Sequence, residues 1–340
     1  MKQGGMNSYN GWQRKVKEMT LSRIYSEQKR NLKMIEKRLE SVLKTSHPIL
    51  SEASLELLKA GGKRIRPLLT LLCAQYGDPD RREVMDSAVM LELIHMASLV
   101  HDDVVDDSEL RRGKPTVKAK WDNRVAMFTG DYIFAKAIEL ISDFKNPEVH
   151  LSISKVIRDL SLGEIDQIKE LYNWKQNLRV YLRRIKRKTA LLMALSCQLG
   201  ALASGCSSYV AMKLFYFGYY MGMSYQITDD ILDFVGTEKQ LGKPAGGDLK
   251  NGNITLPTFF ALNTFGLRES ILQVLETDHP DAETWAQVIQ SIRDSGAIQA
   301  SERLSDAYLR KGQEILDRLP QQRVTRSLKE IANYIGTRNY

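Results

Sequence analysis

The chain has 340 residues, of which 43% are hydrophobic and 26% charged. This is enough apolar material for a large buried core, and it excludes disordered, collagen-like and small disulfide-rich proteins. The net charge of +8 permits a basic surface for phosphates, nucleic acid or anionic lipid without choosing among them. Few prolines and glycines interrupt stretches rich in Leu, Ala, Lys, Glu, Arg and Met, a composition that favours helices.

The cysteines and the N-terminal residues indicate the cellular compartment in which the protein is expected. The three cysteines, Cys73, Cys197 and Cys206, form no CxxC pair and are typical of reduced thiols in the core of a cytosolic protein. The first residues are polar and basic, without an apolar signal segment. The most apolar run, residues 88–100, contains Glu92 and His95 and is too short to span a membrane. We therefore expect a cytoplasmic protein.

In chain order, residues 1–20 predict a disordered tail, and apolar residues at three- and four-residue steps predict an amphipathic helix over 24–43. Further helices are expected over residues 50–60, 64–76, 83–103, 120–142, 147–170, 176–204, 207–234, 255–265, 283–294, 297–318 and 323–335. No alternating strand pattern persists and no linker divides the chain, so we expect one all-α domain over 21–340. The glycine-rich stretch 236–257 is long enough to act as a lid.

Two aspartate clusters end two of the apolar helices. In the first, the spacing places Asp102 and Asp106 on one helical face and Asp103 and Asp107 on the neighbouring face. The second cluster consists of Asp229, Asp230 and Asp233. Carboxylates this close repel each other unless cations lie among them, and hard oxygen donors suit Mg²⁺ shared with substrate phosphates. Two such helix ends facing each other predict one metal–diphosphate site.

Cationic segments accompany these clusters. Anion-binding groups are supplied by three segments: GGKRIRP (61–67), Arg111-Arg112 and Lys188-Thr189. The apolar helices are expected to form an apolar pocket.

With the motifs GD (130–131), QITDDILD (226–233) and GKPAGGDL (242–249), residues 25–340 resemble the trans-prenyltransferases, the isoprenoid diphosphate synthase family, whose fold is an all-α bundle around a deep central cavity. The segments ELIHMASLVHDD and RRIKRKTALL and the C-terminal residues are most similar to the large catalytic component of bacterial heptaprenyl diphosphate synthases. The resemblance implies Mg²⁺-dependent addition of isopentenyl diphosphate to farnesyl diphosphate, yielding a medium-chain product, heptaprenyl (C35), for the menaquinone side chain.

The resemblance also implies a role for each matching residue. Two to three Mg²⁺ ions would be held by Asp102, Asp106 and Asp229, with Asp103, Asp230 and Asp233 in support. The allylic diphosphate would be bound by Arg111, Lys188 and Lys243, with Thr189 and Gln226 stabilising the allylic cation. Isopentenyl diphosphate would be bound by Lys63, Arg66, His95 and Arg112. A second lid lysine found in many relatives is absent here, where Asn253 stands, and whether Lys250 replaces it is left open.

Product length is expected to depend on the residues one or two turns before the first cluster. Ala97 and Ser98 are small where short-chain members carry bulky aromatic residues, so the product tunnel stays open past four isoprene units, and Ile94 is a candidate floor. The exact length is open: hexaprenyl or longer products are the alternative, as is another class I terpenoid enzyme. The resemblance implies a small non-homologous regulatory subunit, with a homodimer as the alternative. Transient contact of the basic N-terminal tail with a membrane is a further alternative, and no nucleic-acid partner is expected.

Overall fold

The structure is a computed structural model that describes residues 21–236, 245–277 and 281–336. The expected disordered tail, Lys243 and much of the expected lid lie outside the described residues. The chain divides into two compact units, each described by itself below. Unit 1 comprises residues 1–153, 195–215 and 319–330, and unit 2 comprises residues 154–194, 216–318 and 331–340. The expectation of a single domain stays a prediction.

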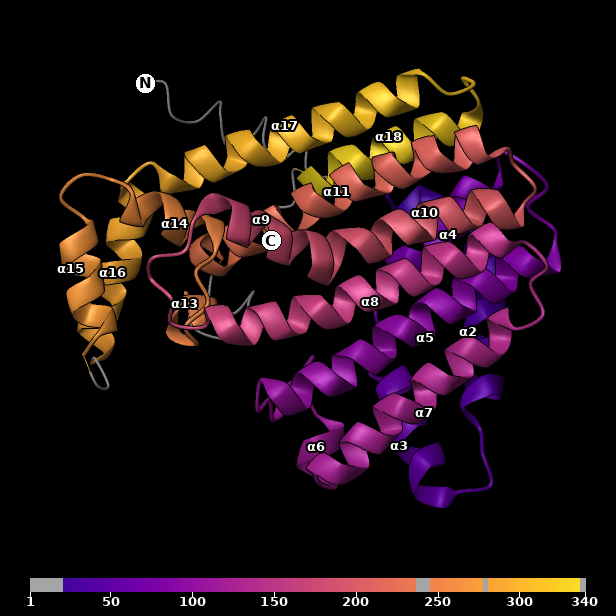
Figure 1. Cartoon of the computed structure of the whole chain (residues 1–340), viewed down its shortest axis with the longest axis horizontal. Helices are drawn as coiled ribbons and strands as arrows, with labels where there is room; N and C mark the ends of the chain where they lie inside the picture. The colour runs from indigo at the N-terminus through magenta and orange to yellow at the C-terminus, as the bar shows by residue number, and fades with distance from the viewer. Residues whose placement is uncertain (1–20, 237–244, 278–280, 337–340) are drawn as a thin grey trace. The chain divides into compact units, whose positions relative to one another are not determined.

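The elements are almost all helical (Figure 1). Those within unit 1 are α2 (Lys29–Leu43), α3 (Pro48–Lys59), α4 (Ile65–Ala74), α5 (Arg82–Val105), β1 (Leu110–Arg111), β2 (Lys114–Pro115), α6 (Val117–Lys120) and α7 (Asn123–Ile141). Those within unit 2 are α9 (Leu178–Ile185), the π-helical turn η1 (Lys186–Ala190), α13 (Gly247–Lys250), α14 (Leu256–Leu262), α15 (Arg268–Leu275), α16 (Ala282–Asp294) and α17 (Ala297–Asp317). Residues of both units occur in α8 (Pro147–Glu170), α10 (Leu191–Ala203), α11 (Ser208–Val235) and α18 (Arg323–Gly336).

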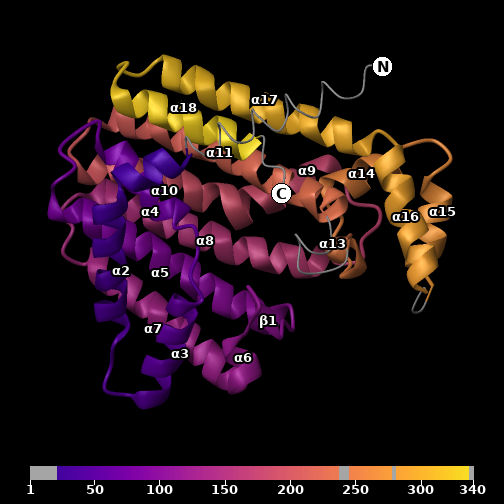
Figure 2. The same cartoon turned by 180° about the vertical axis from the view of Figure 1, so that it is seen from behind.

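Unit 1 is organised around α5. This helix is buried on most sides and packs along α7, with α4 and α2 against its other faces (Figure 2). Because α5 is apolar nearly all round, its burial contributes much of the hydrophobic stabilisation of this unit. Among the described helices it alone is long and apolar enough to cross a membrane, yet 72% of its most apolar window is buried inside the protein. That burial is the behaviour of a core helix.

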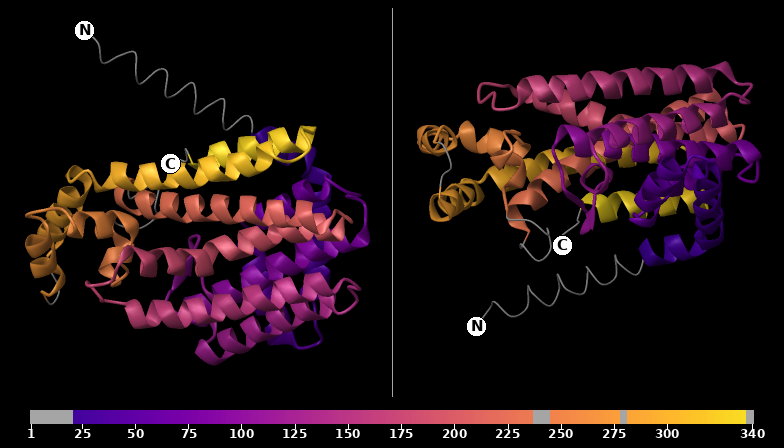
Figure 3. Two further views of the ribbon diagram at one scale, coloured as in Figure 1. Left: turned by 45° about the horizontal axis from the view of Figure 1, so that its top comes forward. Right: turned by 90° about the horizontal axis from the view of Figure 1, so that it is seen from below.

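In unit 2, α14 packs against α17, α16 and α9, and α15 runs alongside α16 (Figure 3). The core is formed by side chains from these helices together with the second half of α11. At Gly222 of α11 a Cβ atom would lie 2.6 Å from the Cα of Ala190, so the missing side chain lets α11 approach η1 closely. This approach places η1 beside the part of α11 that ends in the second aspartate cluster.

Most expected helices are present with ends displaced by a few residues, and four details differ. The expected helix 176–204 is interrupted by η1, a feature common at functional sites. The expected helix 120–142 begins at Asn123, because the Asp122 side chain caps it by accepting a hydrogen bond from Val125 N at 2.7 Å. A hairpin of two-residue strands, β1–β2, follows the first cluster, and the short helices α6, α13 and α15 were not expected.

Candidate active site

The first aspartate cluster lies at the C-terminal end of α5. The amide of Asp106 donates to the carbonyl of Asp102 at 2.8 Å, so these two residues keep the predicted one-turn relation. Asp107 has a φ of +51° and has left the helix. The expectation that Asp103 and Asp107 share a helical face is therefore wrong, because the chain turns into the β1–β2 hairpin at that point.

Cations neutralise the other two carboxylates of this cluster. Asp103 is 2% exposed, and it accepts from Arg111 Nη2 at Oδ1 (2.7 Å) and from Arg111 Nε at Oδ2 (3.1 Å). The pair has the forked geometry that fits a guanidinium to a carboxylate. Asp107 forms an ion pair with the buried Lys118, which also binds Glu109 at 3.1 Å. Arg111, expected to bind the allylic diphosphate, thus has a carboxylate partner inside the protein.

Three of the residues predicted to bind isopentenyl diphosphate come together in unit 1. The pKa of His95 is held well below its ordinary value, first by burial and then by the charges of Arg66 and Arg112. At Gly62, which has a φ of +157°, a Cβ would lie 2.8 Å from Nη1 of Arg112, so this loop and Arg112 are in contact. A neutral imidazole among guanidinium groups suits a diphosphate, because it adds a hydrogen-bond donor without adding like charge.

Lys63, the fourth of these residues, is exposed in the loop that precedes α4. Its backbone carbonyl accepts a hydrogen bond from the Tyr25 hydroxyl. The loop backbone is therefore fixed while the ammonium group lies at the surface.

In unit 2 the second cluster is supported by neutral donors. Asp230 is 3% exposed and accepts from the Tyr181 hydroxyl at 2.7 Å and from Gln226 Nε2 at 2.9 Å. Burial and the nearby charge of Asp248 raise the pKa of Asp230 to about 7. Asp233, 4% exposed, accepts the amide hydrogen of Asp248 at 3.1 Å. Asp229 is the least buried of the three cluster aspartates.

A hydrogen-bonded chain links this cluster to η1. Thr189 Oγ1 donates to Gln226 Oε1 at 2.6 Å, and Gln226 in turn donates to Asp230. Lys188 Nζ donates to Gln167 Oε1 at 2.9 Å and lies 3.6 Å from Glu164 Oε2. The structure thus links three predicted residues of unit 2, Thr189, Gln226 and Asp230, and adds Tyr181, which has no exposed surface. A lone tyrosine on an amphipathic helix gave no signal in the sequence.

Asp102, Asp106 and Asp229 suit a metal ion whose coordination shell is completed by the substrate. Among the described residues, no group of three or more His, Cys, Asp or Glu side chains is arranged to hold a metal ion. Mg²⁺ is commonly bound through one or two carboxylates plus substrate phosphates and water. The exposed Asp106 and the partly buried Asp102 and Asp229 offer hard oxygen donors of this kind.

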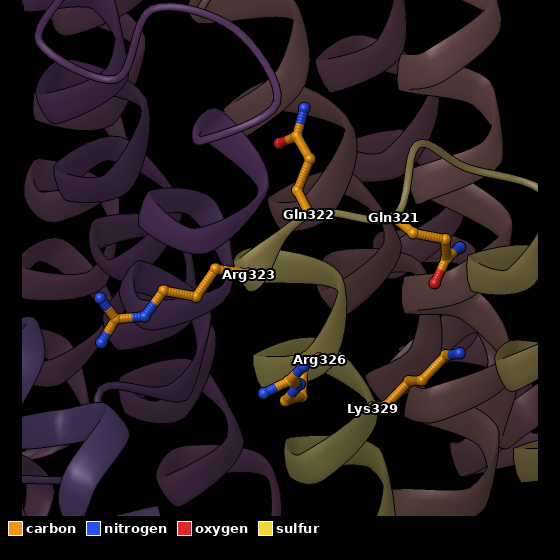
Figure 4. Close-up of a pocket in the computed structure, with 5 residues that line it drawn as sticks. All are labelled: Gln321, Gln322, Arg323, Arg326 and Lys329. Atoms are coloured by element: carbon orange, nitrogen blue, oxygen red, sulfur yellow. The ribbon is translucent and has the colours of Figure 1, made fainter.

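Three cavities lie within single units. In unit 1, one of about 370 Å³ is lined by residues that include Asp103, Arg111 and Lys114, and a basic groove of about 440 Å³ at the start of α18 contains none of the predicted residues (Figure 4). In unit 2, a cavity of about 790 Å³ is lined by aromatic and aliphatic side chains and by Lys250, the candidate replacement for the missing lid lysine.

The family model for polyprenyl synthetases matches residues 47–292. The chain belongs to the polyprenyl synthetase family. It is 51% identical over 325 residues to heptaprenyl diphosphate synthase component 2 of Bacillus subtilis, covering 96% of this chain and 93% of that protein. This match confirms the resemblance drawn from the motifs and identifies the chain as a prenyltransferase.

Solved structures agree in fold. The crystal structure of heptaprenyl diphosphate synthase from Staphylococcus aureus superimposes with a TM-score of 0.86 at 40% identity, covering 92% of this chain and 98% of that one. A polyprenyl synthase from Caulobacter crescentus, complexed with calcium and isoprenyl diphosphate, gives a TM-score of 0.87 at 29% identity, covering 93% and 97%. The expected all-α fold is confirmed.

Proposed function

We propose that this chain extends farnesyl diphosphate with isopentenyl diphosphate to an all-trans polyprenyl diphosphate of seven isoprene units, for the side chain of menaquinone. The observation that carries the proposal is the grouping of Arg66, His95 and Arg112 in the same unit as Asp102 and Asp106. An anion site in the same unit as a carboxylate pair fits a reaction between two diphosphate substrates. The names of the relatives in Bacillus subtilis and Staphylococcus aureus support the seven-unit length.

In the proposed mechanism, Lys63, Arg66, His95 and Arg112 hold the diphosphate of isopentenyl diphosphate. Their charges and donors fix its position, so that its double bond is presented to the allylic carbon. Arg111 and Lys188 contact the allylic diphosphate and stabilise the negative charge that develops as the C–O bond breaks. Lys243 has the same proposed role and lies outside the described residues.

The allylic cation needs stabilisation without a nucleophile. The Thr189 hydroxyl and the Gln226 carboxamide form a connected chain, and their oxygen dipoles stabilise positive charge in a site that excludes water. The isopentenyl double bond attacks the cation, and the released pyrophosphate takes the proton. Tyr181 holds Asp230 and thereby Gln226 in place.

Asp102, Asp106 and Asp229 are the proposed ligands of two to three Mg²⁺ ions. The chemistry that Mg²⁺ supplies when bound is charge neutralisation of the leaving diphosphate. Asp103 and Asp233 are too engaged in internal contacts to be assigned more than a supporting role.

Ala97 and Ile94 are 2% and 3% exposed, and Ser98 donates to the His95 carbonyl at 2.9 Å. We propose that these three residues set product length. We also propose that a companion component completes the enzyme, because the Bacillus subtilis relative is named component 2. A cytoplasmic location is proposed because α5 is a buried core helix.

The test supplies the purified chain with farnesyl diphosphate, isopentenyl diphosphate and Mg²⁺, with and without the companion component, and sizes the products by mass spectrometry. The expected result is a ladder ending at seven units in at least one arm. Products of another length would correct the chain length. Cyclised or head-to-head products, or no turnover in either arm despite native folding, would contradict the proposal.

A further inference from the structure

One cation of the GGKRIRP loop, Arg64, has no role in the scheme above. We propose that Arg64 is a positioning residue of the isopentenyl diphosphate subsite: paired with Glu92 and Glu36, it fixes the turn between Lys63 in the loop and Arg66 in the first turn of α4 without binding diphosphate itself. This inference rests on the proposed function, because it names a determinant of the same subsite.

The contacts of Arg64 are directed into the protein. Its side chain is 9% exposed, while the neighbouring Lys63 is exposed. Nη1 donates to Glu92 Oε1 at 2.7 Å, Nε donates to Glu36 Oε1 at 2.5 Å, and Nη2 donates to the Leu58 carbonyl at 3.2 Å. All three guanidinium nitrogens are therefore engaged with α2, α3 and α5, which leaves the group poorly placed to bind a phosphate as well.

The backbone of Arg64 is also unusual. Arg64 is the residue immediately before α4 and has a φ of +47°, a backbone conformation that residues other than glycine rarely adopt. Lys63 precedes this turn and Arg66 follows it in the first turn of α4. A strained residue persists where the surrounding structure over-determines it, and here the buried pair with Glu92 and the partly exposed pair with Glu36 do so. The orientation of the two substrate-binding side chains, Lys63 and Arg66, thus depends on how Arg64 is held.

The Glu92 contact ties the loop to the third member of the subsite. Glu92 is 3% exposed and lies three residues before His95 on α5, so the two are neighbours along one side of the helix. The Arg64–Glu92 bond therefore joins the loop to the helix that carries His95. The two carboxylates also supply negative charge next to a group of cations that would otherwise repel one another.

A matched control is present between the same helices. Arg38 of α2 lies 3.6 Å from Asp86 of α5, and the Asp86 side chain is 9% exposed. This pair joins α2 to α5 as the Arg64 contacts do, but neither residue belongs to the loop before α4. A role that is merely structural would give Arg64 and Arg38 variants the same phenotype.

The experiment compares Arg64→Lys and Glu92→Gln with the control Arg38→Gln in the full chain, together with the companion component if turnover requires it. Lysine keeps the charge but cannot bridge three acceptors in a fork. We expect the KM for isopentenyl diphosphate to rise about 10- to 100-fold in the first two variants, with the KM for farnesyl diphosphate changed less than about twofold. Arg38→Gln is expected to lower the melting temperature without this selective change.

Equal changes in both KM values, no change in either, or the same selective change in Arg38→Gln would overturn the inference. Glu36→Gln serves if the first variants fail to fold, because the Glu36 side chain is 43% exposed and its loss is milder. If the wild-type enzyme does not elongate farnesyl diphosphate, the proposed function fails by itself. Arg64 is then tested by calorimetric binding of inorganic pyrophosphate, which should weaken in Arg64→Lys and remain unchanged in Arg38→Gln.

Discussion

The two aspartate clusters have similar sequences and differ in how the protein supports them. At the end of α5, cations pair with two of the carboxylates: Arg111 binds the buried Asp103 and Lys118 binds the exposed Asp107. At the end of α11, Asp230 is held by neutral donors from Tyr181 and Gln226. Burial and the charge of Asp248 raise the pKa of Asp230, and the hydrogen bonds from Gln226 and Tyr181 oppose that rise. The same motif can therefore be built into a site in two electrostatically different ways.

The largest expected effect tests whether both clusters serve one reaction. Asp102→Ala and Asp229→Ala should each lower kcat by about 10³-fold or more, because each removes a proposed metal ligand. Asp107→Asn is the control: it changes a carboxylate of the same cluster that is paired with Lys118, and it should retain most of the activity. Full activity in either alanine variant would remove that cluster from the mechanism.

A smaller effect is expected from removing one of the neutral donors that hold the second cluster. Tyr181→Phe removes the 2.7 Å hydrogen bond to Asp230 and leaves a buried carboxylate with one donor fewer. The free energy of unfolding should fall by about 1–3 kcal/mol. kcat should fall about tenfold through misplacement of Gln226. Thermal melts and steady-state kinetics measure both, and a loss of stability at unchanged kcat would reduce Tyr181 to a packing residue.

The role of Ala97 in setting product length can be compared with that of the residue at the matching position on α11. Each residue lies five positions before the first aspartate of its cluster. Ala97→Phe on α5 should shorten the products, because a large ring would fill the space left by a small, buried side chain. The matching residue on α11 is Ser224, whose hydroxyl lies 2.7 Å from that of Ser305. Ser224→Ala should lower stability slightly and leave product length unchanged. Product ladders of the same length from Ala97→Phe and the wild type would refute the assignment.

The smallest expected effect concerns pH. Because the pKa of His95 is lowered in the folded protein, the unfolded state binds more protons once the pH falls below the ordinary histidine value of 6.5. Wild-type stability should therefore decrease relative to His95→Gln between about pH 7.5 and about pH 5.5, by at most about 1.4 kcal/mol for each pH unit below 6.5. A stability difference between the two proteins that does not vary with pH would contradict the neutral, desolvated histidine described for unit 1.

Sequence reasoning succeeded where local pattern decides structure. The long apolar helices α5 and α11 and the clusters at their ends followed from periodicity and spacing. The residues that support the second cluster and the GGKRIRP segment did not, because Tyr181 and Asp230 are 49 positions apart and Arg64 and Glu92 are 28 apart. Whether a helix presents Tyr181 to a carboxylate depends on tertiary packing. The turn η1 was missed for the same reason, since the close approach at Gly222 is a tertiary contact.

The binding roles of Lys63 and Arg66 for isopentenyl diphosphate, and of Lys188 for the allylic substrate, are the core of the proposed mechanism. The most direct measurement is the pair of KM values in two variants, Arg66→Gln and Lys188→Gln. We expect Arg66→Gln to raise mainly the KM for isopentenyl diphosphate and Lys188→Gln to raise mainly the KM for farnesyl diphosphate. Equal increases in both KM values for both variants, or the reverse assignment, would contradict these roles.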